Sequence, residues 1–207
     1  MEGHVARVER TTQRTKLNIP APEVCLALLK EYRAYPNIIA HCKQVAQVAL
    51  FLSEALSHQG LSLNIPLLTA GALLHDIAKA YSIEHPEVNH AEKGAEWLIE
   101  LGYPEVAEIV RFHVNLSGEL KIDEKSIVNY ADKRVKHDTI VSLEERFKDL
   151  LARYGKTEAR RKRIRRLYER TKRLETLIFA PLPFSPDIIN TLGERYEKAA
   201  YSHSLRW

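Results

Sequence analysis

Leu73-Leu74-His75-Asp76-Ile77-Ala78-Lys79 is the stretch that decides the fold, and it closes an apolar segment that begins at Leu67. Residues 67–80 are apolar on nearly all sides, a pattern typical of a helix that other helices cover. His75 and Asp76 are expected in the last turns of this central helix. Imidazole and carboxylate together suit iron, manganese or zinc, and the two oxygens of Asp76 could bridge two ions. The stretch therefore predicts a metal site inside an all-α protein.

Four further residues on other segments offer the same ligand chemistry: His41, His90, His113 and Asp132. Each lies on a segment expected to be helical, and all but His90 lie beside that helix's apolar residues. An inward-facing carboxylate at Asp132 would be costly without a partner, which could be a cation or, alternatively, an arginine. A second His-Asp pair, His137-Asp138, has no apolar flank and is expected at a solvated helix end. Together with the central pair, the four residues predict a cluster of six ligands.

Basic residues beside these ligands are candidates for contact with a substrate phosphate. Lys79 follows His75 by four residues and therefore projects from the same helical face. Its ammonium group could bind a phosphoryl oxygen. Lys133 and Arg134 adjoin Asp132 and are further candidates, with exposed helix charges as the alternative interpretation.

Helical spacing of apolar residues recurs along the chain, whereas alternating strand patterns are almost absent. The expected helices span residues 22–32, 36–56, 64–80, 87–101, 104–113, 123–136, 143–179 (with a break at Gly155 as an alternative) and 185–200. This order predicts three parts. Residues 1–20 would form an N-terminal arm, residues 21–140 a metal-binding catalytic core, and residues 141–207 a basic helical extension that packs on the core.

The composition is ordinary for a globular protein, with 207 residues, 45% apolar and 28% charged. The sequence has no apolar run near the roughly 20 residues needed to span a bilayer, and the N-terminus has no secretory signal. Its two cysteines, Cys25 and Cys42, make no disulfide framework. These features predict a reduced, cytoplasmic protein with no membrane association.

The net charge of +4 hides an asymmetry along the chain. Residues 153–173 contain eleven Lys and Arg against Glu158 and Glu169, which leaves the other 186 residues at −5. Attraction to polyanions would come from this segment alone. A solvated face with core packing is the favoured interpretation, and anion binding is the alternative. Tyr168 is the only aromatic residue between Tyr154 and Phe179, so the segment has no stacking platform for single strands.

The ordered set of ligands resembles that of the HD-domain metal-dependent phosphohydrolases. The resemblance rests on His41, LLHDIAK at 73–79, HAEKGAEWL at 90–98, His113 and YADKRV at 130–135, and it covers residues 36–137. It is closest to the branch with extra histidines, which includes the bacterial symmetric diadenosine tetraphosphate hydrolases. Ala78 replaces the glycine of the His-Asp-Ile-Gly variant, a departure that should not alter ligation.

The resemblance implies a compact helical bundle around one or two divalent ions. One ion would be held by His41, His75, Asp76 and Asp132, and a second by His90 and His113, with Asp76 as the bridge. All six positions are filled, so two ions are expected. Iron or manganese is the first choice, and zinc, cobalt or nickel would also suit the ligands.

The expected activity is hydrolysis of a phosphate ester or anhydride in a small nucleotide, including a dinucleoside polyphosphate. A water between the ions would lose a proton near neutral pH and attack phosphorus in line with the leaving oxygen. Asp76 and Lys79 are the expected catalytic residues, with Lys79 stabilising the charge on the phosphoryl oxygens. The alternatives are a nucleotide-sensing module, a nucleic-acid binder that uses residues 153–173, and a di-iron oxygenase, since myo-inositol oxygenase shares the family's fold. The sequence leaves the oligomeric state open.

Overall fold

The computed structural model describes residues 17–192, which fold into nine α-helices, one 3₁₀ helix and a pair of two-residue strands. The elements are α1 (Pro22–Glu31), α2 (Pro36–Ser57), α3 (Ile65–Leu74), α4 (Lys79–Glu84), α5 (His90–Glu100), α6 (Pro104–Phe112), α7 (Glu124–Lys133), β1 (Val135–Lys136), β2 (Thr139–Ile140), α8 (Leu143–Tyr154), α9 (Glu158–Phe179) and η1 (Pro186–Thr191). This architecture confirms the all-α prediction.

Prolines and side-chain caps start the helices where the sequence predicts. Proline occupies the first turn of α1, α2, α3 and α6, where its missing N–H removes no helical hydrogen bond. Asn64 caps α3 by accepting a hydrogen bond from the Leu67 amide. Asp123 caps α7 through a reciprocal pair of hydrogen bonds with Ser126, which satisfies amides that the helix itself leaves free.

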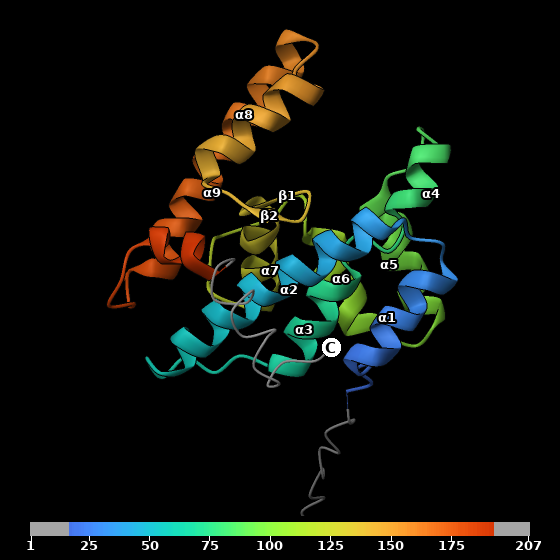
Figure 1. Cartoon of the computed structure of the whole chain (residues 1–207), viewed down its shortest axis with the longest axis horizontal. Helices are drawn as coiled ribbons and strands as arrows, with labels where there is room; N and C mark the ends of the chain where they lie inside the picture. Colours follow the sequence, from blue (N-terminus) through green and yellow to red (C-terminus); the bar gives the residue numbers. More distant parts are fainter. Residues whose placement is uncertain (1–16, 193–207) are drawn as a thin grey trace, which may run out of the picture.

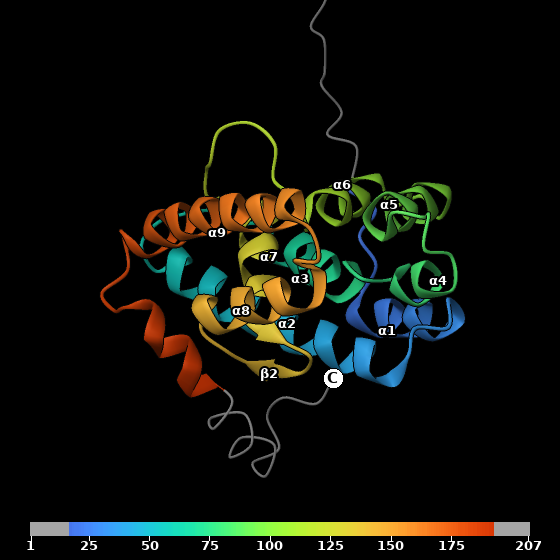
Figure 2. The same cartoon turned by 90° about the horizontal axis from the view of Figure 1, so that it is seen from above.

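The central helix is α3, as the apolar segment predicts. Every residue from Leu68 to Leu74 is buried, and α3 packs against α1, α2, α6 and α7 (Figures 1 and 2). Gly71 permits the close approach of α6, because a Cβ at this position would lie 2.7 Å from a methyl carbon of Ile109. The small residue thus sets the distance between the two helices that end at His75 and His113.

Two helices end earlier than the sequence predicts. The central helix stops at Leu74 rather than Ala80, so His75 and Asp76 lie in the turn between α3 and α4. The helix that begins at Glu124 stops at Lys133 rather than Lys136. The chain then forms the β1–β2 hairpin, in which Val135 pairs with Ile140 and Lys136 with Thr139. The expected solvated helix end at His137-Asp138 is instead the two-residue hairpin loop.

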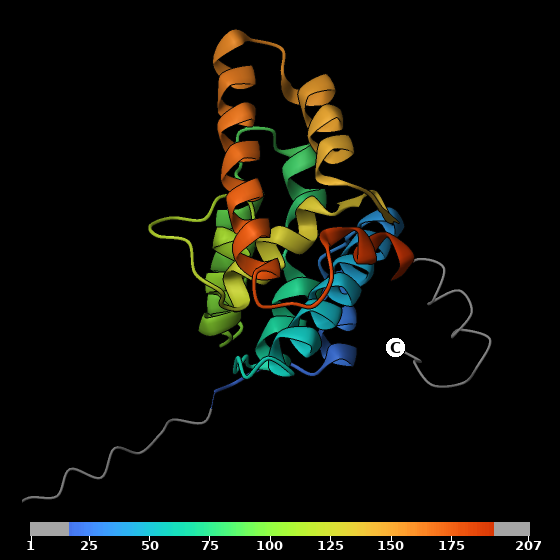
Figure 3. The same cartoon turned by 90° about the vertical axis from the view of Figure 1, so that its left-hand side faces the viewer.

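The basic segment folds as a helical hairpin and not as one long helix. The break falls at Gly155, which was the stated alternative, and Thr157 caps the second helix. Helices α8 and α9 pack against each other and extend well beyond the bundle (Figures 1 and 3). Among the described residues, no helix combines the length and apolar character needed to cross a membrane.

The segment after α9 returns to the bundle. The helix expected from residue 185 begins there as the 3₁₀ helix η1, with Ile189 buried, while the rest of that helix lies outside the described residues, as does most of the expected N-terminal arm. Cys25 and Cys42 are both buried and free.

Candidate metal centre

Six side chains from five segments converge at the middle of the bundle. His41 comes from α2, His75 and Asp76 from the turn after α3, His90 from the start of α5, His113 from the end of α6 and Asp132 from α7. Their Nε2 and carboxylate oxygen atoms meet in a chain of short distances. These are His41 to Asp132 at 3.1 Å, His75 to Asp132 at 3.9 Å, His75 to Asp76 at 3.8 Å, His90 to Asp76 at 3.2 Å and His113 to Asp76 at 3.5 Å.

Helix ends orient two of the imidazoles. His75 and His113 each follow the last residue of a helix, and each Nδ1–H donates to the carbonyl three residues earlier, at 2.7 Å to Ala72 and 2.6 Å to Val110. These carbonyls lie in the last turn, where helical partners are missing. Because Nδ1 carries the proton, Nε2 of the neutral ring is free to bind a metal.

A third imidazole is oriented by the hairpin. His41 Nδ1–H donates to the carbonyl of His137 at 2.6 Å. His137 adopts a positive φ of 57°, a conformation more common for Asn, Asp and His than for other residues with side chains. The hairpin loop therefore has a supporting function that the sequence did not predict, because it directs Nε2 of His41 toward Asp132.

The fourth histidine reaches the cluster through a close contact between helices. His90 opens α5 one turn before Gly94, and a Cβ at Gly94 would lie 3.0 Å from Val110 and 3.1 Å from Ile77. The absence of a side chain at Gly94 lets α5 approach α6 and the turn after α3. His90 Nε2 consequently lies 3.2 Å from Nε2 of His113.

The two carboxylates are buried yet remain ionised. Burial would raise the pKa of Asp76, but the charge of Lys79 and the neighbouring histidines outweigh it and hold the pKa well below the ordinary value. The pKa of Asp132 is also well below the ordinary value. Burial would raise it, but Lys133, His41 and Arg146 lower it by more. Two buried negative charges at the centre of a ring of imidazoles favour cations.

Burial lowers the pKa of three of the histidines, but the net pKa shifts differ in direction. Burial lowers the pKa of His75 to about 3 and also lowers the pKa of His90. Burial acts the same way on His41, but the hydrogen bond and charge of Asp132 overcome it and raise the pKa of His41. His75 and His90 are therefore neutral at pH 7, the form that binds metals.

The residues present fit divalent ions. Two groups of three have ligand atoms that all lie within 4.8 Å of one another: His41, His75 and Asp132, and His75, Asp76 and His113. Nε2 of His75 is buried and has no hydrogen-bond partner within residues 17–192, which a metal would supply. The set contains imidazole and carboxylate without thiolate, as iron, manganese or zinc accepts.

The three basic residues predicted to contact phosphate lie in different positions relative to the cluster. The side chain of Lys79 forms no hydrogen bond or ion pair with the rest of residues 17–192, whereas its backbone N–H donates to the Asp76 carbonyl and its carbonyl accepts from Ser82. Its charge acts on both Asp76 and His90, and its contact with a phosphate stays a prediction. Lys133 is buried at the cluster, where its Nζ donates to Asp132 at 2.7 Å and to the His113 carbonyl at 3.0 Å.

Arg134 does not have the geometry of a phosphate contact. Its side chain is buried and donates away from the cluster, to the carbonyls of Val141 and Pro186 and to the side chains of Tyr130 and Asn190. Adjacent helical residues diverge by about 100°, so Arg134 turns away where Lys133 turns inward. The arrangement corrects the prediction: Arg134 ties α7 to the segment after α9.

Arg146 on α8 is a residue of the site that the sequence did not indicate. Its Nη2 lies 3.8 Å from Asp132 and its Nη1 lies 3.3 Å from Asp149. Its Nε is buried without a partner among the described residues. The signal that could have found it is its spacing, since it follows Leu143 by three residues and precedes Leu150 by four, on the inward face.

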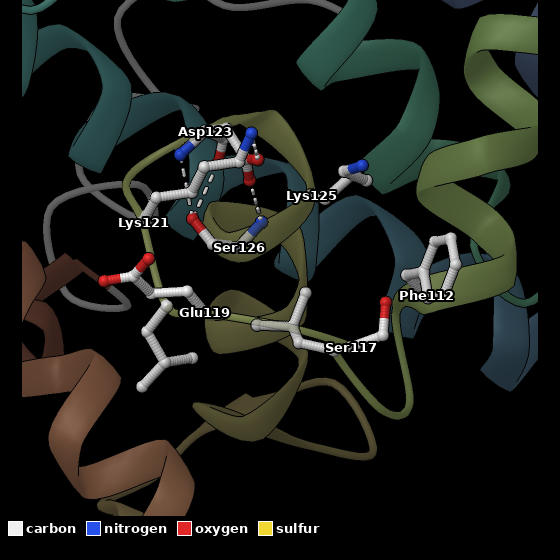
Figure 4. A pocket seen from close by; sticks show the side chains of 9 residues that line it. Phe112, Ser117, Glu119, Lys121, Asp123, Lys125 and Ser126 are labelled. Atoms are coloured by element: carbon white, nitrogen blue, oxygen red, sulfur yellow. Dashed lines mark hydrogen bonds and ion pairs between the residues drawn. The ribbon is translucent and has the colours of Figure 1, made fainter.

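A separate hollow of about 50 Å³ lies beside the loop between α6 and α7 (Figure 4). Its lining includes Phe112, Glu119 and Lys125 and none of the six ligands. Asp123 and Ser126, which also line it, are engaged in the cap of α7. A nucleotide pocket has several hundred Å³, so the hollow is not a substrate site.

Comparisons with known proteins agree with the geometry. A family model for the HD domain matches residues 38–135. An uncharacterized protein of Methanocaldococcus jannaschii is 31% identical over 160 residues, which are 69% of this chain and 91% of the relative. A tRNA (cytidine(56)-2'-O)-methyltransferase of Thermoplasma volcanium is 35% identical over 97 residues, but these are only 26% of that enzyme and 46% of this chain.

A solved structure of a predicted HD superfamily hydrolase, from an uncultured Thermotogales bacterium, is 23% identical with a TM-score of 0.43, covering 76% of this chain and 91% of that chain. The matched segment 38–135 contains all six side chains of the centre. This chain therefore contains an HD domain, which spans residues 38–135.

Proposed function

We propose that this protein hydrolyses a phosphate ester or anhydride bond of a small nucleotide with the help of two divalent ions. One observation carries the proposal: four imidazoles and two ionised carboxylates converge on one point, and Lys79, Lys133 and Arg146 surround it with positive charge. Such a centre attracts both cations and the phosphate groups that cations bind. Dinucleoside polyphosphates are one candidate class, which the resemblance to the diadenosine tetraphosphate hydrolases suggests.

The ligands divide between two ions. His41, His75 and Asp132 would hold the first and His90 and His113 the second, with Asp76 as a ligand that both ions would share. When bound, the ions would supply Lewis acidity and an activated water. The protein's contribution is orientation, since backbone carbonyls fix His41, His75 and His113 before any ion arrives.

The basic residues would bind the phosphoryl oxygens. Lys79 acts from the side of Asp76 and Arg146 from the side of Asp132, so a phosphate between the two ions would meet a positive charge on both sides. Arg146 can offer two N–H groups to one phosphate because its fork is planar. The side chain of His90 is the most exposed of the four imidazoles at 19%, and we place the substrate entry beside it.

The test is metal analysis of the purified protein followed by a screen of nucleotides, dinucleoside polyphosphates and cyclic dinucleotides. We expect hydrolysis that depends on manganese or iron. Asp76→Asn should lose bound metal and activity together. Asp138→Asn is the matched control, because Asp138 belongs to the second His-Asp pair and is exposed; it should behave as wild type.

Two results would contradict the proposal. Full activity of Asp76→Asn would remove the bridging carboxylate from the mechanism. Tight nucleotide binding without turnover, in protein that holds both metals, would instead favour the alternative of a nucleotide-sensing module.

A further inference from the structure

The helical hairpin formed by α8 and α9 carries a concentrated positive surface. Seven basic side chains on its α9 side are exposed, and we call them the basic face: Lys156, Arg160, Lys162, Arg163, Arg166, Lys172 and Arg173. The seven side chains themselves form no ion pair and no hydrogen bond with another residue in the range 17–192, although the backbones of Arg160 and Lys172 bond to threonine hydroxyls. Two acidic residues of the hairpin pair with other partners, since Glu158 pairs with Arg161 and Arg165, and Asp149 with Arg146 and Arg153. Glu169 is exposed and forms no ion pair with the basic face within residues 17–192.

This surface differs from an ordinary solvated helix face. Exposed helices usually alternate charges of opposite sign at spacings of three and four residues, which stabilises them. On α9 the same spacings join like charges, as between Arg160 and Arg163 and between Lys162 and Arg166. The positive charges on α9 repel one another, while the rest of the chain has a net negative charge. A polyanion laid along α9 would relieve this repulsion.

The position of the basic face leaves it open to a large partner. Buried residues of α9 begin only at Thr171, so the half of the helix nearest the tip makes little contact with the bundle. Figures 1 and 3 show this half of the hairpin standing clear of the other helices. Arg163, Arg166 and Arg173 are separated by three and seven residues and therefore lie on one side of the helix.

The chemistry of the face suits phosphates and not exposed bases. Eight of the eleven basic residues in the segment 153–173 are arginines, whose planar fork matches two phosphate oxygens. Tyr168 is half-buried and packs on Phe147 at a ring distance of 5.0 Å, so it offers no surface on which bases could stack. Contact would run along a phosphate backbone.

We propose that the basic face binds double-helical nucleic acid through its phosphates, without sequence preference. Arg163 and Arg173 are ten residues apart, or about 15 Å along the helix axis, and this length spans about four nucleotides of one strand. The inference uses none of the residues of the metal centre and holds whether or not the proposed hydrolysis does. Duplex DNA and duplex RNA share the backbone chemistry, and the experiment separates them.

The experiment measures fluorescence anisotropy of labelled 20-base-pair DNA and RNA duplexes of one sequence, titrated with the full chain at several salt concentrations. The test variant is Arg163→Gln/Arg166→Gln/Arg173→Gln. Glutamine keeps the helix propensity close to that of arginine. The control variant, Lys30→Gln/Arg33→Gln/Lys121→Gln, removes the same three charges from exposed positions outside the hairpin, so both variants have a formal net charge of +1 instead of +4.

We expect binding to at least one duplex, with affinity that falls steeply as salt rises. The test variant should lower the slope of log K against log salt by about 2.7, at about 0.9 for each lost phosphate contact, and weaken binding by about 500-fold at 0.1 M salt. The control should keep the wild-type slope. Metal content and thermal stability should remain unchanged in both variants.

Several outcomes would overturn the proposal. These are no binding to either duplex at low salt, an equal loss in the control variant, or tighter binding to a single strand of the same sequence. Binding to vesicles that contain an anionic phospholipid, with the same sensitivity to the three arginines and no binding to nucleic acid, would assign the face to a membrane surface instead.

Discussion

Acid should destabilise the metal-free protein through His75. Burial lowers the pKa of this imidazole to about 3 in the folded chain, whereas the ordinary value is about 6.5. Below pH 6.5 the unfolded chain binds a proton that the folded chain does not, so stability falls as pH drops toward 3. Between pH 7 and pH 5 the loss is about 2 kcal/mol. This figure holds for any folded pKa well below 5.

Other titrating groups near His75 also change the folding stability at low pH. His41 acts in the opposite direction, because its raised pKa adds stability as pH falls through the folded value, and this contribution is fully present below the unfolded value. Asp76 and Asp132 have depressed pKa values, so their contribution is lost only at lower pH, below the unfolded value of about 3.9. A comparison with a His75 variant therefore isolates the effect of His75.

The assay is urea unfolding with a chelator present, at pH 7 and pH 5, on wild type and His75→Asn. Asparagine has an amide N–H that can replace the bond from Nδ1 to the Ala72 carbonyl, and it does not titrate. The wild type should lose about 2 kcal/mol more than the variant over this interval, with equal dependence on urea. Equal losses in the two proteins would refute the assignment of a depressed pKa to His75.

Three further substitutions test the packing that positions the site. Gly71→Ala should destabilise the protein by about 1–3 kcal/mol, because the added Cβ would lie 2.7 Å from Ile109; an unchanged melting temperature would contradict the close contact of α3 and α6. Arg134→Met should cost roughly 3 kcal/mol or more in chemical unfolding, since buried partners lose their donor, while metal content per folded molecule stays the same; a loss of metal with normal stability would return Arg134 to the site. Asp123→Ala should cost about 1 kcal/mol in unfolding free energy through the cap of α7, and no change would mean that the cap contributes nothing.

The sequence predicts which side chains converge because most of them lie on segments with clear apolar spacing. His41, His113 and Asp132 lie beside apolar residues of amphipathic helices, and the structure brings them together with His75, Asp76 and His90. Helix starts were also predictable, since proline and Asn64 mark them locally. The inward direction of a helical side chain and the start of a helix both depend on residues within four positions in the sequence.

The remaining features depend on contacts between distant segments. The apolar pattern continues to Ala80, so nothing local predicts that the helix ends at Leu74, where imidazole and carbonyl find each other. Lys133 and Arg134 point in opposite directions because Lys133 donates to the His113 carbonyl and Arg134 donates to the side chain of Asn190. The proximity of Arg146 to Asp132 requires α8 to fold back on α7.

The central claim is that the six side chains hold two ions. The most direct test is anomalous diffraction from a crystal grown with manganese. We expect two peaks about 3.5–4 Å apart, one among His41, His75 and Asp132 and the other among Asp76, His90 and His113. A single peak would contradict the pair of ions, and the absence of any peak, with the imidazoles still in the positions described, would contradict the metal centre itself.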